Sequence, residues 1–183
     1  MKVLHVISDS NIGGAGVLLL SLLRNFDSDR VESLVALPKG SALIQRITQA
    51  GVPVVELDEG CDRYSAASVR EIKAVIRDCG AELIHANGAI CARIAGRACG
   101  IAVLHTRHCC FPPSGIWRLG AVRFLGGILN RMLSDRVIAT AEAAAKDLRI
   151  LGIPSRKIEV IINGSEPVQK IFFVQVKIGR LLS

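Results

Sequence analysis

The stretch "KVLHVISDSNIGGAGVLLLSLL", residues 2–23, decides the fold of this chain. Its opening part, 2–8, is a mainly apolar run with the composition of a buried strand. A glycine-containing turn follows, and the apolar residues after it continue at helical spacing over 15–25. A strand, a glycine turn and a helix in direct succession predict the opening of a β-α-β unit.

The same alternation of strands and helices continues along the chain. The predicted strands span 2–8, 31–38, 52–57, 81–86, 101–106, 136–140 and 157–162, and the predicted helices span 15–25, 41–51, 65–80, 88–99, 116–133 and 141–151. Ser65 or Ser68 is a candidate N-cap of the helix that Gly80 ends. This regular alternation predicts an α/β fold with a Rossmann-like, doubly wound parallel sheet.

The composition fits one α/β domain. A chain of 183 residues is long enough for one buried core. Hydrophobic residues make up 50% of it and aromatic residues only 4%, which predicts an aliphatic core of helices on a parallel sheet. The apolar runs are shorter than a membrane span and no signal-peptide cleavage site follows the first strand, so we expect a cytoplasmic protein.

The net charge of +7 favours anionic partners such as phosphates, nucleotides and acidic lipid head groups. The basic residues are scattered and do not alternate with aromatic residues, so we expect no nucleic-acid partner. An ordinary solvated basic surface is the alternative. The six cysteines contain no C-x-x-C pair, which indicates reduced thiols rather than a zinc site or a disulfide framework.

Polar residues follow most of the predicted strands, at the edge where open parallel sheets bind their ligands. Three of the four histidines belong to these strand ends, namely His85, His105 and His108. Each one alone is compatible with a structural role, whereas three on one edge predict a pocket. The polar strand ends are 8–11, 38–40, 85–88, 104–108, 140–142 and 163–166.

The glycine turn does not have the spacing of a dinucleotide site. Leu19 stands where G-x-G-x-x-G needs its third glycine, and the second strand ends in Pro38 and Lys39 instead of an acidic residue. A G-K-[ST] sequence is also absent, which excludes a P-loop. Gly13 and Gly14 still allow a ligand to approach the backbone at a helix N-terminus, where anions bind. A tight turn without a ligand is the alternative.

Four features together resemble a known family: "MKVLHVIS" running into "NIGGAG", the strand end "LHTRH", the segment "SDRVIATAEAAAKDLRILGIPSRKIEVIINGSE" over 134–166, and the spacing among them. The third is the most specific, because "GIPSRKI" leads to an Asn-Gly at the position of the family's interdomain crossing. Over residues 1–166 the chain resembles the N-terminal domain of a GT-B-fold glycosyltransferase of family 4 (group 1).

The resemblance implies an acceptor-binding domain that works with a C-terminal domain holding a nucleotide-sugar donor. It implies sugar transfer with retention of configuration, without a metal or other cofactor, the nucleotide sugar being a co-substrate. The acceptor would be a glycan or a lipid-linked molecule, as in the synthesis of cell-envelope polysaccharides.

The resemblance also assigns roles to individual residues. His108 would be the catalytic histidine, which contacts the transferred sugar. Arg107 would bind the acceptor or a phosphate, and Glu142 would either belong to the cleft or act only as the carboxylate at a helix N-terminus. The implied binding residues are Gly13, Gly14, Gly16, Asn87, Thr106, Arg107 and Glu142.

The predicted helix 116–133 has two different sides. One side carries Gly120, Arg123, Gly127, Asn130 and Ser134, and the opposite side carries Leu125, Leu129 and Met132. Relatives that act on lipid-linked acceptors touch the membrane through basic or apolar surfaces of this domain, so the resemblance implies peripheral contact with the inner membrane face. The alternative is a helix packed on the sheet.

The family pattern is incomplete in this chain. No two glutamates have the Glu-x7-Glu spacing of the donor domain, and 167–183 resembles a linker followed by the first strand of that domain. We therefore expect a truncated or split enzyme that is inactive by itself. The alternatives are a non-catalytic module that binds a phosphorylated or glycosylated ligand, and another sugar-nucleotide enzyme such as an epimerase.

Overall fold

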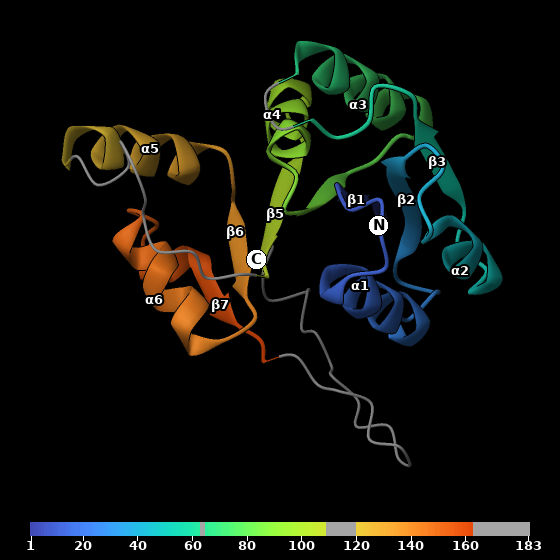
Figure 1. Cartoon of the computed structure of the whole chain (residues 1–183), viewed down its shortest axis with the longest axis horizontal. Helices are drawn as coiled ribbons and strands as arrows, with labels where there is room; N and C mark the ends of the chain where they lie inside the picture. The colour runs from blue at the N-terminus through green and yellow to red at the C-terminus, as the bar shows by residue number, and fades with distance from the viewer. Residues whose placement is uncertain (63–64, 109–119, 163–183) are drawn as a thin grey trace.

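The computed structural model describes residues 1–62, 65–108 and 120–162 (Figure 1). These residues form a 7-stranded sheet in which every neighbouring pair is parallel, with the order β3-β2-β1-β4-β5-β6-β7. The strands are β1 (Lys2–Ile7), β2 (Glu32–Pro38), β3 (Val54–Leu57), β4 (Leu83–Asn87), β5 (Ala102–Arg107), β6 (Arg136–Ala139) and β7 (Ile158–Val160). The prediction of a parallel, doubly wound α/β sheet is confirmed.

Helices connect successive strands, as the alternation predicts. They are α1 (Gly14–Asn25), α2 (Ile44–Gln49), α3 (Ala66–Cys79), α4 (Ile90–Cys99), α5 (Gly120–Met132) and α6 (Glu142–Ile150). Ser65 caps α3 by accepting a hydrogen bond from the backbone N–H of Ser68, and Gly80 ends it in the left-handed conformation with φ 65°. The predicted helix at 41–51 is shorter in the structure, because 41–43 form a turn in which the Ser41 hydroxyl accepts the N–H of Leu43.

Two hydrophobic cores lie on opposite faces of the sheet, because successive strand residues point to opposite sides. On one face, α1 and α2 pack against Ile7, Val35 and Leu37. On the other face, α3 and α4 pack against strand residues such as Leu4 and Ile84. Figure 1 shows α1 and α2 on one side of the strands and α3 and α4 on the other. From β1 the chain adds β2 and β3 on one side of the sheet and then returns to add β4 to β7 on the other side of β1. The strand order therefore switches between β1 and β4.

Helix α4 approaches the sheet closely at Gly96. A Cβ atom added to Gly96 would overlap the side chain of Ile84 and lie 2.9 Å from Cγ2 of Val103. Both contacts are with side chains that are themselves buried, so they cannot move aside easily. Glycine is needed here for space in the contact between α4 and the sheet.

Helix α5 turns its small and polar side toward the protein. Gly127 is buried, and a Cβ added there would lie 2.7 Å from the backbone oxygen of Leu151 at the end of α6. Asn130 and the following Ser134 bind the buried guanidinium of Arg93 on α4. The packed side therefore matches the Gly127, Asn130 and Ser134 side predicted from the sequence.

The apolar side of α5 faces solvent instead. Leu129 is 52% exposed and Met132 is 64% exposed. An amphipathic helix normally buries its apolar side, so α5 is inverted relative to the usual pattern. Gly120 and Arg123 belong to the first turns, whose side chains lie outside the described part of the chain. Among the described residues, no helix combines the length and the apolar character that crossing a membrane requires.

Candidate functional site

The carboxyl ends of the strands form the candidate site. Asn87 is the last residue of β4, and His108 directly follows β5, its neighbour in the sheet. Nε2 of His108 lies 3.1 Å from Oδ1 of Asn87. Because an amide oxygen only accepts hydrogen bonds, Nε2–H is the donor, and Nδ1 of His108 is left for another partner.

The structure places Asn87 so that its amide fixes the ring of His108. Asn87 is 4% exposed, and its Nδ2 is buried without a hydrogen-bond partner among the described residues. A buried amide N–H2 without a partner is costly, and such groups in native proteins usually have a functional or solvent-related reason. The unpaired N–H2 belongs to the same amide group as the oxygen that holds His108, so it is part of the same site.

The electrostatic surroundings keep His108 neutral. Burial lowers the pKa of His108, and the negative charge of Asp9 opposes that shift in part. Asp9 follows β1 and lies beside the glycine turn, since a Cβ added to Gly13 would be 3.3 Å from its Oδ2. Asp9 belongs to the predicted polar strand end 8–11, but the sequence assigns it no individual role. Its position directly after the central strand was the signal that could have identified it.

The glycine turn ends at the N-terminus of α1. Gly13 is the N-cap residue, in an extended conformation, and no side chain caps the helix. The first turn itself contains no acidic residue, and the nearby carboxylate is that of Asp9 beside the N-cap. A Cβ added to Gly14 would meet nothing within 4 Å, which indicates open space in front of the helix.

Gly16 has a different surrounding from Gly13 and Gly14. It is buried, and a Cβ added there would lie 2.7 Å from Cδ2 of Leu43. The requirement for glycine at this position therefore comes from packing between α1 and the turn before α2. The implied binding role of Gly16 stays a prediction.

Thr106 and Arg107 point away from each other, because they are successive residues of β5. Thr106 is buried, and its Oγ1 lies 2.7 Å from Nε2 of His85. Arg107 donates from Nη2 to Oδ2 of Asp147 on α6 at 3.1 Å, while its Nε is buried without a partner among the described residues. Both side chains are thus already engaged by neighbouring elements.

The prediction of three histidines on the rim is wrong for two of them. His85 and His105 are 4% and 7% exposed and lie inside β4 and β5. His85 takes part in a polar chain that crosses four adjacent strands from β5 to β2. The chain consists of Thr106, His85, His5 and Ser33, with a His85 Nδ1 to His5 Nδ1 distance of 3.0 Å and a His5 Nε2 to Ser33 Oγ distance of 3.3 Å.

Glu142 is the first residue of α6 and is exposed. Its carboxylate stands in the first turn, a position where a negative charge can compensate the positive end of a helix dipole. The structure does not join it to His108 or Asn87 by a contact. Both roles given to Glu142, in the cleft and at the helix N-terminus, therefore stay predictions.

Metal ligands do not gather at this edge. In the described ranges, no group of three or more His, Cys, Asp or Glu side chains could hold a metal ion. The described cysteines, Cys61, Cys79, Cys91 and Cys99, are free thiols. The edge instead combines a neutral imidazole, a carboxylate and an uncapped helix N-terminus, which together can bind hydroxyl groups and a phosphate.

The family model of Glycosyltransferase Family 4 matches residues 12–167. No curated protein matches the chain. The matched range includes the glycine turn, both strand ends that carry Asn87 and His108, and the whole of α6.

Several solved structures share the fold. One is Anabaena Alr3699/HepE in complex with UDP and glucose, with 19% identity and a TM-score of 0.67 over 90% of this chain and 45% of that chain. A glycosyltransferase from Rickettsia africae has 16% identity and a TM-score of 0.67 over 89% and 43%. UDP-GlcNAc 2-epimerase from Neisseria meningitidis, bound to UDP-GlcNAc, has 18% identity and a TM-score of 0.62 over 87% and 45%.

At these identities the likeness establishes the fold alone. The chain spans less than half the length of each of these three structures.

Proposed function

The chain belongs to Glycosyltransferase Family 4, and from this premise we propose that it forms the acceptor-side domain of a retaining glycosyltransferase. The enzyme would transfer a sugar from a nucleotide sugar to a glycan or a lipid-linked acceptor. Solved structures of the same fold contain UDP with glucose, or UDP-glucose, which supports a nucleotide-sugar donor.

The observation that carries the proposal is the Asn87–His108 pair beside the uncapped N-terminus of α1. Asn87 occupies Nε2–H of His108, which leaves Nδ1 of the neutral ring free to accept a hydrogen bond from a sugar hydroxyl. We therefore assign His108 to the transferred sugar and Asn87 to holding its ring. Asn87 is a positioning residue in this proposal.

The N-terminus of α1 would serve the diphosphate of the donor. Negative charge grows on the diphosphate as its bond to the sugar breaks, and unpaired N–H groups at a helix N-terminus stabilise such charge. Gly14 leaves the space through which a phosphate can reach these N–H groups. Asp9, whose carboxylate lies beside Gly13, would bind a hydroxyl of the acceptor.

We propose that the donor itself is held mainly by a second domain. The chain spans 45% of the structure that contains UDP and glucose, so the rest of that fold has no counterpart in these residues. The predicted linker and strand at 167–183 lie outside the described residues. Residues 1–183 alone should therefore bind ligands at the cleft but transfer sugar poorly.

The inverted side of α5 supports the predicted peripheral contact with a membrane. Leu129 and Met132 are exposed on it, and Ile128 beside them is also exposed. Exposed apolar side chains on a helix of a basic protein are typical of a surface that lies on a membrane. A lipid-linked acceptor would reach the cleft from that surface.

Two other functions stay open as alternatives. A binding module would use the same edge without catalysis, and would bind a phosphorylated or glycosylated ligand in the absence of any donor domain. An epimerase is favoured by one observation, the fold shared with UDP-GlcNAc 2-epimerase. Incubation of the chain with UDP-GlcNAc, followed by analysis for the C2 epimer, distinguishes the epimerase from the transferase.

A titration of the isotope-labelled chain with nucleotide sugars and with glycan or lipid-linked acceptors tests the proposal. We expect shifts of the amide resonances of Gly14 and His108, and their loss in His108→Ala. The exposed Gln49→Ala variant on α2 is the control, because this residue is remote from the sheet edge. Shifts that persist unchanged in His108→Ala, or that lie elsewhere, would contradict the proposed site.

A further inference from the structure

A basic pocket lies at the end of the sheet where the strands begin. The candidate site lies at the other end, where the strands finish. The pocket has a volume of about 470 Å³ and is lined by Arg97, Arg131, Met132, Arg156 and Lys157. These residues come from the end of α4, the end of α5 and the turn directly before β7, so they all lie where strands begin. The pocket and the candidate site described above share no residue.

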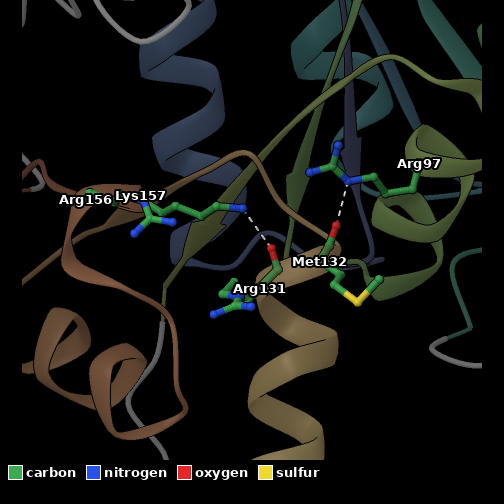
Figure 2. A pocket seen from close by; sticks show the side chains of 5 residues that line it. All are labelled: Arg97, Arg131, Met132, Arg156 and Lys157. Carbon is green, nitrogen blue, oxygen red and sulfur yellow. Dashed lines mark hydrogen bonds between the residues drawn. The ribbon is translucent and has the colours of Figure 1, made fainter.

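Two of the cations are fixed by hydrogen bonds to the end of α5 (Figure 2). Lys157 donates from Nζ to the backbone oxygen of Arg131 at 2.8 Å and to that of Ser134 at 2.7 Å. Arg97 donates from Nε to the backbone oxygen of Met132 at 2.7 Å. These bonds satisfy carbonyl groups that the end of a helix leaves unpaired, and they hold both cations in place without neutralising them.

The positive charge of the pocket is poorly compensated. Asp135 pairs with Arg97, the two atoms Oδ1 and Nη2 lying 2.6 Å apart. Across the part of the chain that the structure describes, no carboxylate pairs with Arg131 or Arg156, and both side chains are exposed. The pocket therefore presents four cations against one carboxylate.

The surroundings of Lys157 reflect this excess of positive charge. Burial lowers the pKa of Lys157, Asp135 raises it in part, and the nearby charges of Arg97, Arg156 and Arg131 lower it further. An anion in the pocket would relieve this repulsion. Lys157 uses two of its three N–H donors, and the free guanidinium groups of Arg131 and Arg156 can each bind two oxygens at once.

We propose that this pocket binds a phosphate group, carried either by a soluble phosphate ester or by the head group of an anionic phospholipid. A phosphate presents several oxygens to guanidinium groups, which a carboxylate or a chloride ion cannot do to the same extent. The exposed side chain of Met132 forms the apolar wall of the pocket and suits an organic group attached to the phosphate. The proposal does not depend on the function assigned to the cleft.

The test uses the full isotope-labelled chain and a titration with inorganic phosphate, then pyrophosphate, at constant ionic strength. We expect saturable shifts of the amide resonances of Arg131, Met132 and Lys157. The double variant R131Q/R156Q should weaken this binding roughly tenfold or more, because it removes two charge-assisted contacts. These side chains are exposed and have no carboxylate partner, so the variant should fold normally.

The matched control is R46Q/R70Q, which removes the same charge from two exposed arginines on α2 and α3. It should bind phosphate as the wild-type chain does. Equal weakening of phosphate binding in both double variants would show that binding depends only on net charge, and it would overturn the proposal. Absence of saturable shifts at the pocket would overturn it as well, whereas His108→Ala should leave these shifts unchanged.

Sedimentation with vesicles then identifies the source of the phosphate. Vesicles of phosphatidylglycerol and phosphatidylcholine are compared with vesicles of phosphatidylcholine alone. Retention on the anionic vesicles that is lost in R131Q/R156Q and kept in R46Q/R70Q assigns the pocket to a phospholipid head group. Phosphate shifts without retention on vesicles assign it to a soluble phosphate ester.

Discussion

Lowering the pH from 7 to 5 should destabilise the chain through its buried histidines. Burial, with repulsion from His108 in its protonated form as the smaller cause, lowers the pKa of His85 to about 3. Burial and the neighbouring His85 also hold the pKa of His5 well below its ordinary value. In the unfolded chain both groups titrate with a pKa near 6.5, so below that pH the unfolded state binds more protons than the folded state.

The sign and the size of the effect follow from this difference. The stabilisation is fully present above pH 6.5 and is lost as the pH falls from 6.5 toward 3. At pH 5 His85 alone should lower the free energy of unfolding by about 2 kcal/mol. This follows because pH 5 lies roughly 1.5 units below the unfolded pKa, at about 1.4 kcal/mol per unit. His5 changes the stability in the same direction, and so does His105, whose pKa burial also lowers.

The hydrogen bonds of His5 and His85 explain why the folded state disfavours an added proton on this pair. The two Nδ1 atoms of His5 and His85 face each other at 3.0 Å, so one must carry a proton and the other must accept it. Protonation of the accepting ring at its Nδ1 places two N–H groups opposite each other. The two Nε2 atoms lie against the Ser33 and Thr106 hydroxyls, so both rings of the neutral pair are fully hydrogen-bonded.

Urea unfolding at pH 7 and pH 5 measures the effect. His85→Gln lowers the stability at both values, but its difference between pH 7 and pH 5 should be about 2 kcal/mol smaller than that of the wild-type chain. Gln49→Ala, exposed on α2, should keep the wild-type difference. A wild-type chain equally stable at both pH values, or a His85→Gln chain with the full difference, would refute the reasoning.

Three further predictions concern packing and the cleft. Gly96→Ala should destabilise the chain by about 1–3 kcal/mol in urea unfolding, because the added methyl overlaps the sheet, whereas Gly14→Ala should leave stability nearly unchanged. Arg93→Ala should cost about 3 kcal/mol by the same measurement, because it leaves the polar partners of a buried guanidinium unsatisfied. Asn87→Ala should weaken nucleotide-sugar binding roughly tenfold in calorimetry while the chain stays folded, because the ring of His108 loses its fixed orientation; unchanged affinity would remove Asn87 from the site.

The fold could be predicted from the sequence because it depends on local patterns. Hydrophobic runs, helical spacing and glycine stops each report on a few neighbouring residues, and a parallel α/β sheet repeats these signals in every unit. Most boundaries agree within a few residues, as for α3 at 66–79 against the predicted 65–80. The departures lie where a turn with its own hydrogen bonds replaces the first residues of a helix, as before α2.

The candidate site could be predicted only in its location. The sequence places His85, Thr106 and Arg107 near strand ends, but it does not say which face each side chain takes or what it contacts. Arg107 turns to Asp147, a residue 40 positions later in the chain, and that pairing depends on the packing of α6. The role of Asp9 beside Gly13 likewise depends on how the turn folds back.

Because α5 packs its small and polar side against the protein, substitutions should be restricted on that side and tolerated on the exposed apolar side. An ordinary amphipathic helix shows the opposite distribution. At Gly127 the backbone of Leu151 and Gly152 leaves no room for any side chain, so this position admits glycine alone. At Leu129 and Met132 the protein imposes no volume constraint, so a membrane or another partner would be the selecting force there. Hydrophobic residues conserved on the outer side of α5 would therefore record a partner and not the stability of the domain.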